Sequence, residues 1–281
     1  MYRLLIMIII ENENCLDTIK RIYCGGYDFN KVDVILTSPP YNTARVNNKT
    51  KIGSYDYKSG ESFPDDRYDS YNDNMTNEEY CQFTVNLFNE FDKILSKNGV
   101  VLYNISYGSE NTECMFMAVN DVIRNTPFTI ADTIVWKKKV AVPNNVSPNK
   151  LTRICEFVFV FCREHELDTF NSNKKCISTS TTGQAIYENV YNLIEADNND
   201  GVCPYNRATY SSSLCMQLLN IYAKKGSIVY DPFMGSGTTA VACKKMGHDC
   251  IGSEISEKQV QYALNRVDGA DSRKKIVVKN I

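Results

Sequence analysis

The chain has few histidines, no closely paired cysteines and no long hydrophobic run, and each absence excludes a class of protein. Two histidines and eleven scattered cysteines without a C-x-x-C pair argue against a zinc site and favour reduced thiols in a cytosolic enzyme. No segment approaches the roughly 18 apolar residues that a membrane helix needs. The apolar run at 4–10 leads into Glu11 without a cleavage site, which favours a core strand over a signal peptide.

An excess of charge is also absent, because 31 Lys and Arg stand against 33 Asp and Glu, for a net charge of −2. The chain therefore has no global basic field, and any contact with nucleic acid must come from local patches. With 281 residues, of which 43% are hydrophobic, it can form one large domain or one domain with an insertion.

Short strand-like runs alternate with helical patterns, which predicts a sheet covered by helices on both faces. A capping box at Thr76 and Glu79 marks the start of one helix, and Asn98-Gly99 is expected to end it. Strands are expected at 4–10, 32–36, 100–105, 130–136, 157–161, 227–230, 249–252 and 276–278. Helices are expected at 15–23, 76–98, 211–225, 238–246 and after Ser256.

Two stretches follow neither pattern. Residues 42–75 are polar and rich in tyrosine, and they are expected to form a mobile loop that serves as a lid or a binding loop. Residues 137–206 begin with a segment, ending at Arg153, that holds five basic residues and no acid, and they continue with an irregular stretch. We expect the range 137–206 to be an insertion from the sheet that carries target recognition.

A glycine-rich turn lies between the expected strand 227–230 and the expected helix 238–246, where cofactors with phosphate or ribose usually dock. Gly235 and Gly237 allow a sharp turn and a close approach of the backbone. Glu254 ends the next expected strand and is placed to accept hydrogen bonds from ribose hydroxyls. The pattern G-x-G-x-x-A also matches a nicotinamide fingerprint, and a tight turn with helix-packing glycines remains open.

Ser38, Pro39, Pro40 and Tyr41 follow the expected strand 32–36 and fit a pocket for a planar base that carries an exocyclic amine. Such an amine is a poor nucleophile, because its lone pair is delocalised into the ring. Acceptors on both amine protons favour the pyramidal form, which can attack an electrophilic methyl group. The structural alternative is a strand that ends in a Pro-Pro turn with a surface tyrosine.

Together these two motifs resemble those of the S-adenosylmethionine-dependent DNA amino-methyltransferases, in the permuted class whose catalytic motif precedes the cofactor motif. The resemblance implies an α/β fold, a Rossmann-like doubly wound and mostly parallel sheet, in a single domain over 1–281. It implies that Ser38 and the Pro39 carbonyl accept the amine protons, that Pro40 stiffens the turn and that Tyr41 stacks on the base. Asp231 would meet the charged amino-acid end of the cofactor.

The resemblance also implies the cofactor, S-adenosylmethionine, and the residues that bind it. Asn14 follows the first strand, where the family often has a polar pair near the cofactor adenine. An ordinary helix N-cap is the equal alternative for Asn14. The residues expected to bind the cofactor are Asn14, Asp231, Phe233, Gly235, Ser236, Gly237, Thr238, Thr239 and Glu254.

The expected substrate is a base flipped out of double-stranded DNA. Family members that act on cytosine N4 usually carry Ser or Thr at the position of Ser38, so N4-cytosine is favoured and N6-adenine stays open. The residues expected to contact DNA are Asn42, Arg45, Lys137, Lys138, Lys139, Lys150 and Arg153. An NAD-dependent oxidoreductase and a non-catalytic nucleic-acid-binding protein are the alternatives from other classes.

The same resemblance leads us to expect a cytoplasmic protein of prokaryotic or viral type, without membrane contact. A homodimer and a companion restriction endonuclease are the further partners that it leaves open.

Overall fold

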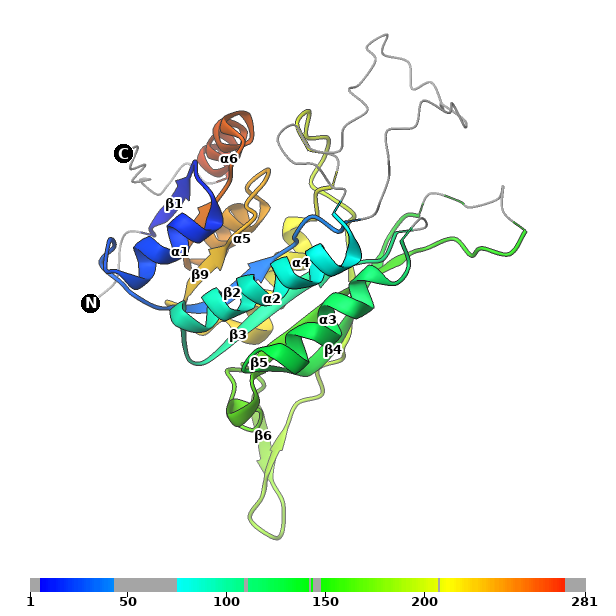
Figure 1. Ribbon diagram of the computed structural model, residues 1–281. Helices are drawn as coiled ribbons and strands as arrows, with labels where there is room; N and C mark the ends of the chain where they lie inside the picture. The colour runs from blue at the N-terminus through cyan, green and yellow to red at the C-terminus, as the bar shows by residue number, and fades with distance from the viewer. Residues whose placement is uncertain are drawn as a thin grey trace.

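An eight-stranded sheet, parallel at every pairing except those of β5, forms the centre of the described molecule (Figure 1). The computed structural model describes residues 6–42, 75–108, 111–141, 143, 148–206 and 208–270. The strands are β1 (Ile8–Glu11), β2 (Val32–Thr37), β3 (Leu95–Ile105), β4 (Phe128–Lys138), β5 (Cys155–Arg163), β6 (Cys176–Thr179), β7 (Ala185–Tyr187), β8 (Leu193–Ala196), β9 (Ile228–Asp231) and β10 (Asp249–Ser253). The helices are α1 (Cys15–Tyr23), α2 (Asn77–Ile94), α3 (Cys114–Asn125), the short η1 (Glu164–Glu166), α4 (Ser212–Tyr222), α5 (Thr238–Met246) and α6 (Glu257–Gly269).

The strand order β1-β10-β9-β2-β3-β5-β4-β8 brings distant parts of the chain together. β2 runs parallel to β9, with Val34 beside Val229 and Ile35 beside Tyr230. Since both strands point the same way, the segments that follow them, at Ser38 and at Pro232, leave the same edge of the sheet. The doubly wound, mostly parallel α/β fold expected from the sequence is confirmed.

Side chains alternate between the two faces of the sheet and pack into two separate hydrophobic cores. Val34 and Leu36 of β2 pack in the core that α4, α5 and α6 cover, whereas Ile35 faces the core under α1, α2 and α3. In Figure 1 the helices α1, α2 and α3 lie in front of the sheet. Because both faces of β2 are buried, its carboxyl end is held rigidly at the rim where the motifs meet.

The helix α2 begins as its capping box predicts and ends earlier than expected. Thr76 Oγ1 accepts a bond of 3.2 Å from the Glu79 backbone N–H, and Glu79 Oε2 accepts one of 2.9 Å from the Thr76 N–H. The helix ends at Ile94 rather than at Asn98-Gly99, because the next residue, Leu95, already pairs with Val32 of β2. Helix α3 was not expected at all.

The range 137–206 does not leave the sheet as one insertion, so that expectation was wrong. β5 lies in the sheet between β3 and β4, and β8 pairs with the other side of β4. Alternate apolar side chains let β5 fill both cores, since Phe159 faces one and Val158 the other. Between these strands, residues 164–192 leave the sheet, and the β6–β7 hairpin projects away from it in Figure 1.

The two described ends of the expected loop 42–75 are joined by hydrogen bonds. Asn42 Oδ1 accepts a bond of 2.9 Å from the Met75 N–H, and Asn42 Nδ2 donates one of 3.0 Å to the Met75 carbonyl. Residues 43–74, with Arg45, and the run at 276–278 lie outside the described residues. Across the described ranges, no helix combines the length and the apolar character needed to cross a membrane.

Candidate cofactor and target-base site

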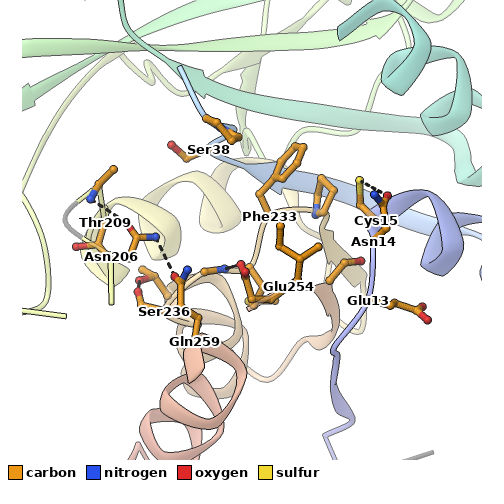
Figure 2. Close-up of a pocket in the computed structure, with 18 of the residues that line it drawn as sticks. Glu13, Asn14, Cys15, Ser38, Asn206, Thr209, Phe233, Ser236, Glu254 and Gln259 are labelled. Carbon is orange, nitrogen blue, oxygen red and sulfur yellow. Dashed lines mark hydrogen bonds between the residues drawn. The ribbon is translucent and has the colours of Figure 1, made fainter. Parts of the chain in front are cut away.

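One pocket at the carboxyl edge of the sheet is shared by the two predicted motifs. Ser38 and Pro40 contribute from the turn after β2, and Phe233 and Gly235 contribute from the turn after β9. Figure 2 shows Ser38 on one side of the pocket, with Glu254, Ser236 and Gln259 on the opposite side. The remaining lining residues are Glu13, Asn14, Cys15, Leu16, Phe83, Asn206, Ala208, Thr209, Tyr210, Pro232, Met234, Thr238, Ser253 and Ile255.

The glycine turn, residues 235–237, has a backbone that other residues rarely adopt. Gly235 has a φ of 51° and Gly237 has a φ of 83°. A Cβ on Gly235 would lie 3.1 Å from Asn206 Nδ2, on the wall of the pocket. The Gly235 N–H donates a bond of 2.9 Å to Glu254 Oε2, which fixes the turn against the end of β10.

Asp231 is buried and is not among the residues that line the pocket, and its expected contact with the cofactor stays a prediction. Its Oδ1 accepts bonds from Thr37 Oγ1 at 2.8 Å and from the Phe233 N–H at 3.0 Å. Its Oδ2 accepts from Thr239 Oγ1 at 2.6 Å and from the Tyr210 hydroxyl at 3.2 Å. Burial raises the pKa of this carboxyl, and the donors oppose that shift. Asp231 therefore ties β2 to β9.

The remaining residues expected to bind the cofactor divide between the pocket wall and the layer behind it. Gly237 and Thr239 do not line the pocket. Asn14 does, and its side chain also accepts a bond of 2.9 Å from the Leu16 N–H at the start of α1. Both interpretations of Asn14 are therefore compatible with the structure. Those on the wall are Asn14, Phe233, Gly235, Ser236, Thr238 and Glu254.

Sequence reasoning missed several polar groups on this wall. Asn206 Nδ2 donates a bond of 3.1 Å to Gln259 Oε1, which joins the segment before α4 to the first turn of α6. Gln259 followed Ser256 in an evident capping pattern, but nothing in that pattern indicated that its side chain reaches the pocket. Cys15 also lines the pocket, and burial raises the pKa of its thiol to about 12, so it is not a nucleophile at neutral pH.

The Ser-Pro-Pro-Tyr turn, residues 38–41, is held from both sides. The Tyr80 hydroxyl on α2 donates a bond of 2.6 Å to the Pro40 carbonyl. On the other side, Thr37 is bonded to Asp231, as described above. Because neighbouring elements fix its backbone, the turn presents Ser38 at the pocket in a defined orientation.

Two residues that the sequence did not single out, Asn104 and Glu156, join this turn in a hydrogen-bonded cluster. The Tyr41 hydroxyl lies 2.9 Å from Ser38 Oγ and donates a bond of 2.9 Å to Glu156 Oε2. Asn104 Nδ2 donates to the Tyr41 oxygen at 2.7 Å and contacts Ser38 Oγ at 3.3 Å and Glu156 Oε2 at 3.2 Å. A polar residue inside the apolar run of β3 was the available signal for Asn104.

Three of the four lysines expected to contact DNA, Lys137, Lys138 and Lys139, each pair with an acid. Lys137 binds Glu195 at 2.6 Å and Lys139 binds Asp197 at 2.9 Å, and both acids come from β8 or the residue after it. Lys138 forms an ion pair with Glu156 of β5. The segment lacks acids in sequence, but its neighbours in the sheet supply them. The charges of Lys137, Lys138 and Lys139 are therefore offset by these acids, and their contact with DNA stays a prediction.

The other residues expected to contact DNA have different surroundings. Asn42 is buried and its side chain is bonded to Met75, so it joins the two described ends of the range 42–75. Lys150 and Arg153 are exposed. The Arg153 guanidinium lies 5.2 Å from the centre of the Tyr107 ring and donates to the Tyr107 carbonyl, just beyond the carboxyl end of β3. Arg153 thus lies at the same edge of the sheet as Ser38.

A doubly wound sheet with a glycine turn, an acid after the next strand and a facing Ser-Pro-Pro-Tyr turn defines a methyltransferase-type α/β protein. The model of a family described as DNA methylase, of the N6/N4 type, matches residues 32–265. The chain belongs to this family and is an S-adenosylmethionine-dependent DNA methyltransferase.

Individual methyltransferases are also similar in sequence to this chain over most of its length. The type II methyltransferase M.HinfI of Haemophilus influenzae is 23% identical over 261 residues, which cover 90% of this chain and 66% of that protein. M.Cfr9I of Citrobacter freundii is 24% identical over 295 residues, with 92% and 87% covered. This chain thus spans about two thirds of M.HinfI and most of M.Cfr9I.

Solved structures share the fold. The PvuII DNA methyltransferase, described as cytosine-N4-specific, superposes with a TM-score of 0.69 at 14% identity, over 93% of this chain and 86% of that one. The complex of M1.HpyAVI with S-adenosylmethionine gives a TM-score of 0.60 at 21% identity, over 93% of this chain and 100% of the other. At these identities the likeness shows the fold alone.

Proposed function

We propose that this enzyme transfers a methyl group from S-adenosylmethionine to the exocyclic amine of a flipped base in a specific duplex DNA sequence, with cytosine N4 as the favoured target. One observation carries the proposal. Ser38, the candidate acceptor for the amine, and Gly235, on the candidate cofactor turn, line the same pocket although they are far apart in the chain. A methyl donor and an acceptor must meet at such a point for a direct transfer.

The wall chemistry fits S-adenosylmethionine. Glu254 offers carboxylate oxygens for ribose hydroxyls, and the glycine turn leaves open the space that a Cβ on Gly235 would enter. Phe233 and Ile255 supply apolar surface for the adenine ring, and Asn14 supplies a polar group at its edge. When bound, the cofactor supplies an electrophilic methyl group on a sulfonium sulfur.

The chain's own residues act on the target amine. Ser38 Oγ and the Pro39 carbonyl each accept one amine proton, which localises the lone pair on the nitrogen so that it can form the new N–C bond. Tyr41 stacks against the base, and one proton leaves the methylated nitrogen for solvent. The bond from the Tyr80 hydroxyl to the Pro40 carbonyl keeps the turn, and with it the acceptors, fixed while charge develops.

The choice of cytosine N4 depends on Ser38, whose neutral hydroxyl the sequence resemblance associates with cytosine. N6 of adenine is the second candidate, because a hydroxyl accepts an adenine amine proton equally well. Mass spectrometry of nucleosides from methylated DNA distinguishes them. We expect N4-methylcytosine, and N6-methyladenine alone would overturn the choice of base while leaving the methyltransferase assignment intact.

The duplex must also be gripped and read outside the pocket. Arg153, and Lys150 close to it in the chain, are proposed to contact the DNA backbone, and residues 164–192 are proposed to carry target recognition within the wider range 137–206. The type II relatives suggest a companion restriction endonuclease acting on the same site. We further propose that the enzyme is a cytoplasmic protein of prokaryotic or viral type. Gel filtration distinguishes a homodimer from a monomer.

Replacing Ser38 by Ala tests the proposal directly. We expect S38A to lower kcat for DNA methylation by about a hundredfold or more, because an acceptor in the transition state is lost. Its affinity for S-adenosylmethionine, measured by calorimetry, should stay within about twofold of wild type, because Ser38 is proposed to face the base.

Ser96→Ala is the matched control, since Ser96 lies at the opposite end of β3 and bonds to Asp33 at 3.0 Å. We expect wild-type turnover from S96A. Full activity of S38A, or tight binding of NAD with no response to S-adenosylmethionine, would contradict the proposed function.

A further inference from the structure

The cluster of Ser38, Tyr41, Asn104 and Glu156 has a defined direction of hydrogen bonding. The Tyr41 hydroxyl donates its single proton to Glu156 Oε2, because an ionised carboxylate can only accept. In its contact of 2.9 Å with Ser38, the Tyr41 oxygen is therefore the acceptor and the Ser38 hydroxyl is the donor. The proton of Ser38 consequently points toward Tyr41.

Asn104 supports the same direction from beneath the turn. Its amide nitrogen, a donor, lies 2.7 Å from the Tyr41 oxygen and 3.2 Å from Glu156 Oε2. A donor at this position favours a Tyr41 proton that points away from it and toward the carboxylate. Asn104 is fully buried, so water does not compete for these bonds.

Glu156 is itself held in place. Lys138 forms an ion pair with Oε1, which leaves Oε2 for Tyr41 and Asn104. The Lys138 ammonium also lies 4.9 Å from the centre of the Trp136 ring, and the Glu156 side chain is 15% exposed. The carboxylate therefore keeps one position at the end of the hydrogen-bond chain.

We propose that Glu156 is a positioning residue that orients the Ser38 hydroxyl through Tyr41 and so prepares it to accept a proton of the target amine. The inference rests on the proposed function, because the direction of the Ser38 proton matters only if Ser38 meets that amine. A hydroxyl has one proton and two lone pairs. With the proton committed to Tyr41, a lone pair of Ser38 faces the base.

The opposite orientation would inhibit the reaction. A Ser38 hydroxyl that donated to the amine nitrogen would occupy the lone pair that must form the N–C bond. In the proposed step, the amine nitrogen gains the methyl carbon, the C–S bond breaks with its electron pair on sulfur, and one amine proton then passes to water. Glu156 takes up no proton in this sequence and acts only by orienting the Ser38 hydroxyl through Tyr41.

Replacing Glu156 by Gln removes the charge and adds a donor while keeping the shape. We expect E156Q to lower kcat by about ten- to a hundredfold, in line with the loss of a hydrogen bond to a charged group. KM for DNA and the affinity for S-adenosylmethionine should stay within about twofold, because the base and cofactor contacts are unchanged. The matched control is Glu90→Gln, a partly exposed acid paired with Lys93 on α2, for which wild-type kcat is expected.

Tyr41→Phe and the double variant test whether Glu156 acts through Tyr41. Y41F keeps the ring that would stack on the base, leaves the Glu156–Lys138 pair intact and removes the hydroxyl that links Glu156 to Ser38. We expect a loss in kcat like that of E156Q. The kcat of the double variant should lie within about twofold of that of the slower single variant. Both changes interrupt the same chain of hydrogen bonds from Glu156 to Ser38.

The outcomes separate this inference from the proposed function. Wild-type kcat in Y41F would overturn it whatever happens to the folding of E156Q. Losses that multiply in the double variant would also overturn it, because Glu156 would then act independently of Tyr41. If S38A stays fully active, the proposed function itself fails. If S38A is inactive and E156Q is fully active, the inference about Glu156 is overturned and the proposed function stands.

Discussion

At the scale of single residues, Gly237 and Gly247 share a backbone conformation but differ in their surroundings. They flank α5 with φ angles of 83° and 87°. A Cβ at Gly237 would lie 2.6 Å from Ala263 Cβ and 3.0 Å from Ala263 Cα, whereas one at Gly247 would meet nothing within 4 Å. Gly237 therefore allows α5 and α6 to approach each other closely behind the cofactor turn.

Substitutions at Gly237 and Gly247 distinguish the cost of backbone strain from the cost of overpacking. We expect Gly247→Ala to lower the free energy of unfolding by about 1–2 kcal/mol, the cost of a left-handed conformation for a residue with a Cβ. Gly237→Ala should lose about 2–5 kcal/mol, because the same strain is joined by overpacking against α6. Urea unfolding of both variants measures the difference, and equal losses would contradict the close α5–α6 contact.

The sequence predicted those site residues that stand together in a short motif. Ser38 and Gly235 each belong to a short motif whose chemistry is visible in adjacent positions. Glu156 could not be found in this way, because it lies 115 positions from Tyr41 and reaches it only through the sheet. The lysines 137–139 show the same limit, because their acidic partners come from another strand.

At the scale of elements, Asp231 joins two strands and a helix at the point where the motifs meet. It binds Thr37 at the end of β2, Thr239 in α5 and the backbone of its own turn. Sequence resemblance placed this carboxylate on the cofactor. Its hydrogen bonds to Thr37 and Thr239 indicate that it also holds β2, β9 and α5 together, while the contact with the cofactor stays a prediction.

Asp231→Asn tests that assignment, because it replaces one acceptor oxygen by a donor that faces other donors. We expect a loss of about 2–4 kcal/mol in the free energy of unfolding, as for other buried polar groups left unsatisfied. Asp28→Asn, at an exposed position, should change stability by less than about 0.5 kcal/mol. A large loss of affinity for S-adenosylmethionine with unchanged stability would instead favour direct contact with the cofactor.

The elements themselves were predicted better than their ends or their order. Apolar runs bounded by caps predicted β2, α2, β9 and α5, because local propensity and burial agree there. The early end of α2 and the place of β5 between β3 and β4 depend on pairing between distant strands, which the local pattern does not encode.

At the scale of the whole molecule, a net charge of −2 leaves DNA binding to local contacts. Lys137 and Lys139 lie beside acids, whereas Arg153 lies at the edge of the sheet where Ser38 is placed. The guanidinium is thus better placed than these lysines to meet a phosphate near the flipped base.

Substitutions at these positions should therefore differ in their effect on DNA affinity. We expect Arg153→Gln to weaken binding of a short duplex about three- to tenfold and to lower the salt dependence by about one phosphate contact. Lys137→Gln, whose charge is already offset by Glu195, should change affinity by less than about twofold. Fluorescence anisotropy at several salt concentrations measures both, and the reverse order would show that the β4 lysines make the main contact.

The pairing of β1 with β10 has a consequence for how the enzyme is made. Met7 donates its N–H to Asp249, a residue 242 positions later, and β10 is the described strand that pairs with β1. At about 5–20 residues per second, a ribosome needs roughly 12–50 s to synthesise the chain between them. During that time the first strand waits unpaired, and the pocket that needs both Asn14 and Glu254 is incomplete. A nascent chain therefore completes its cofactor pocket only after the segment that carries Glu254 has been synthesised.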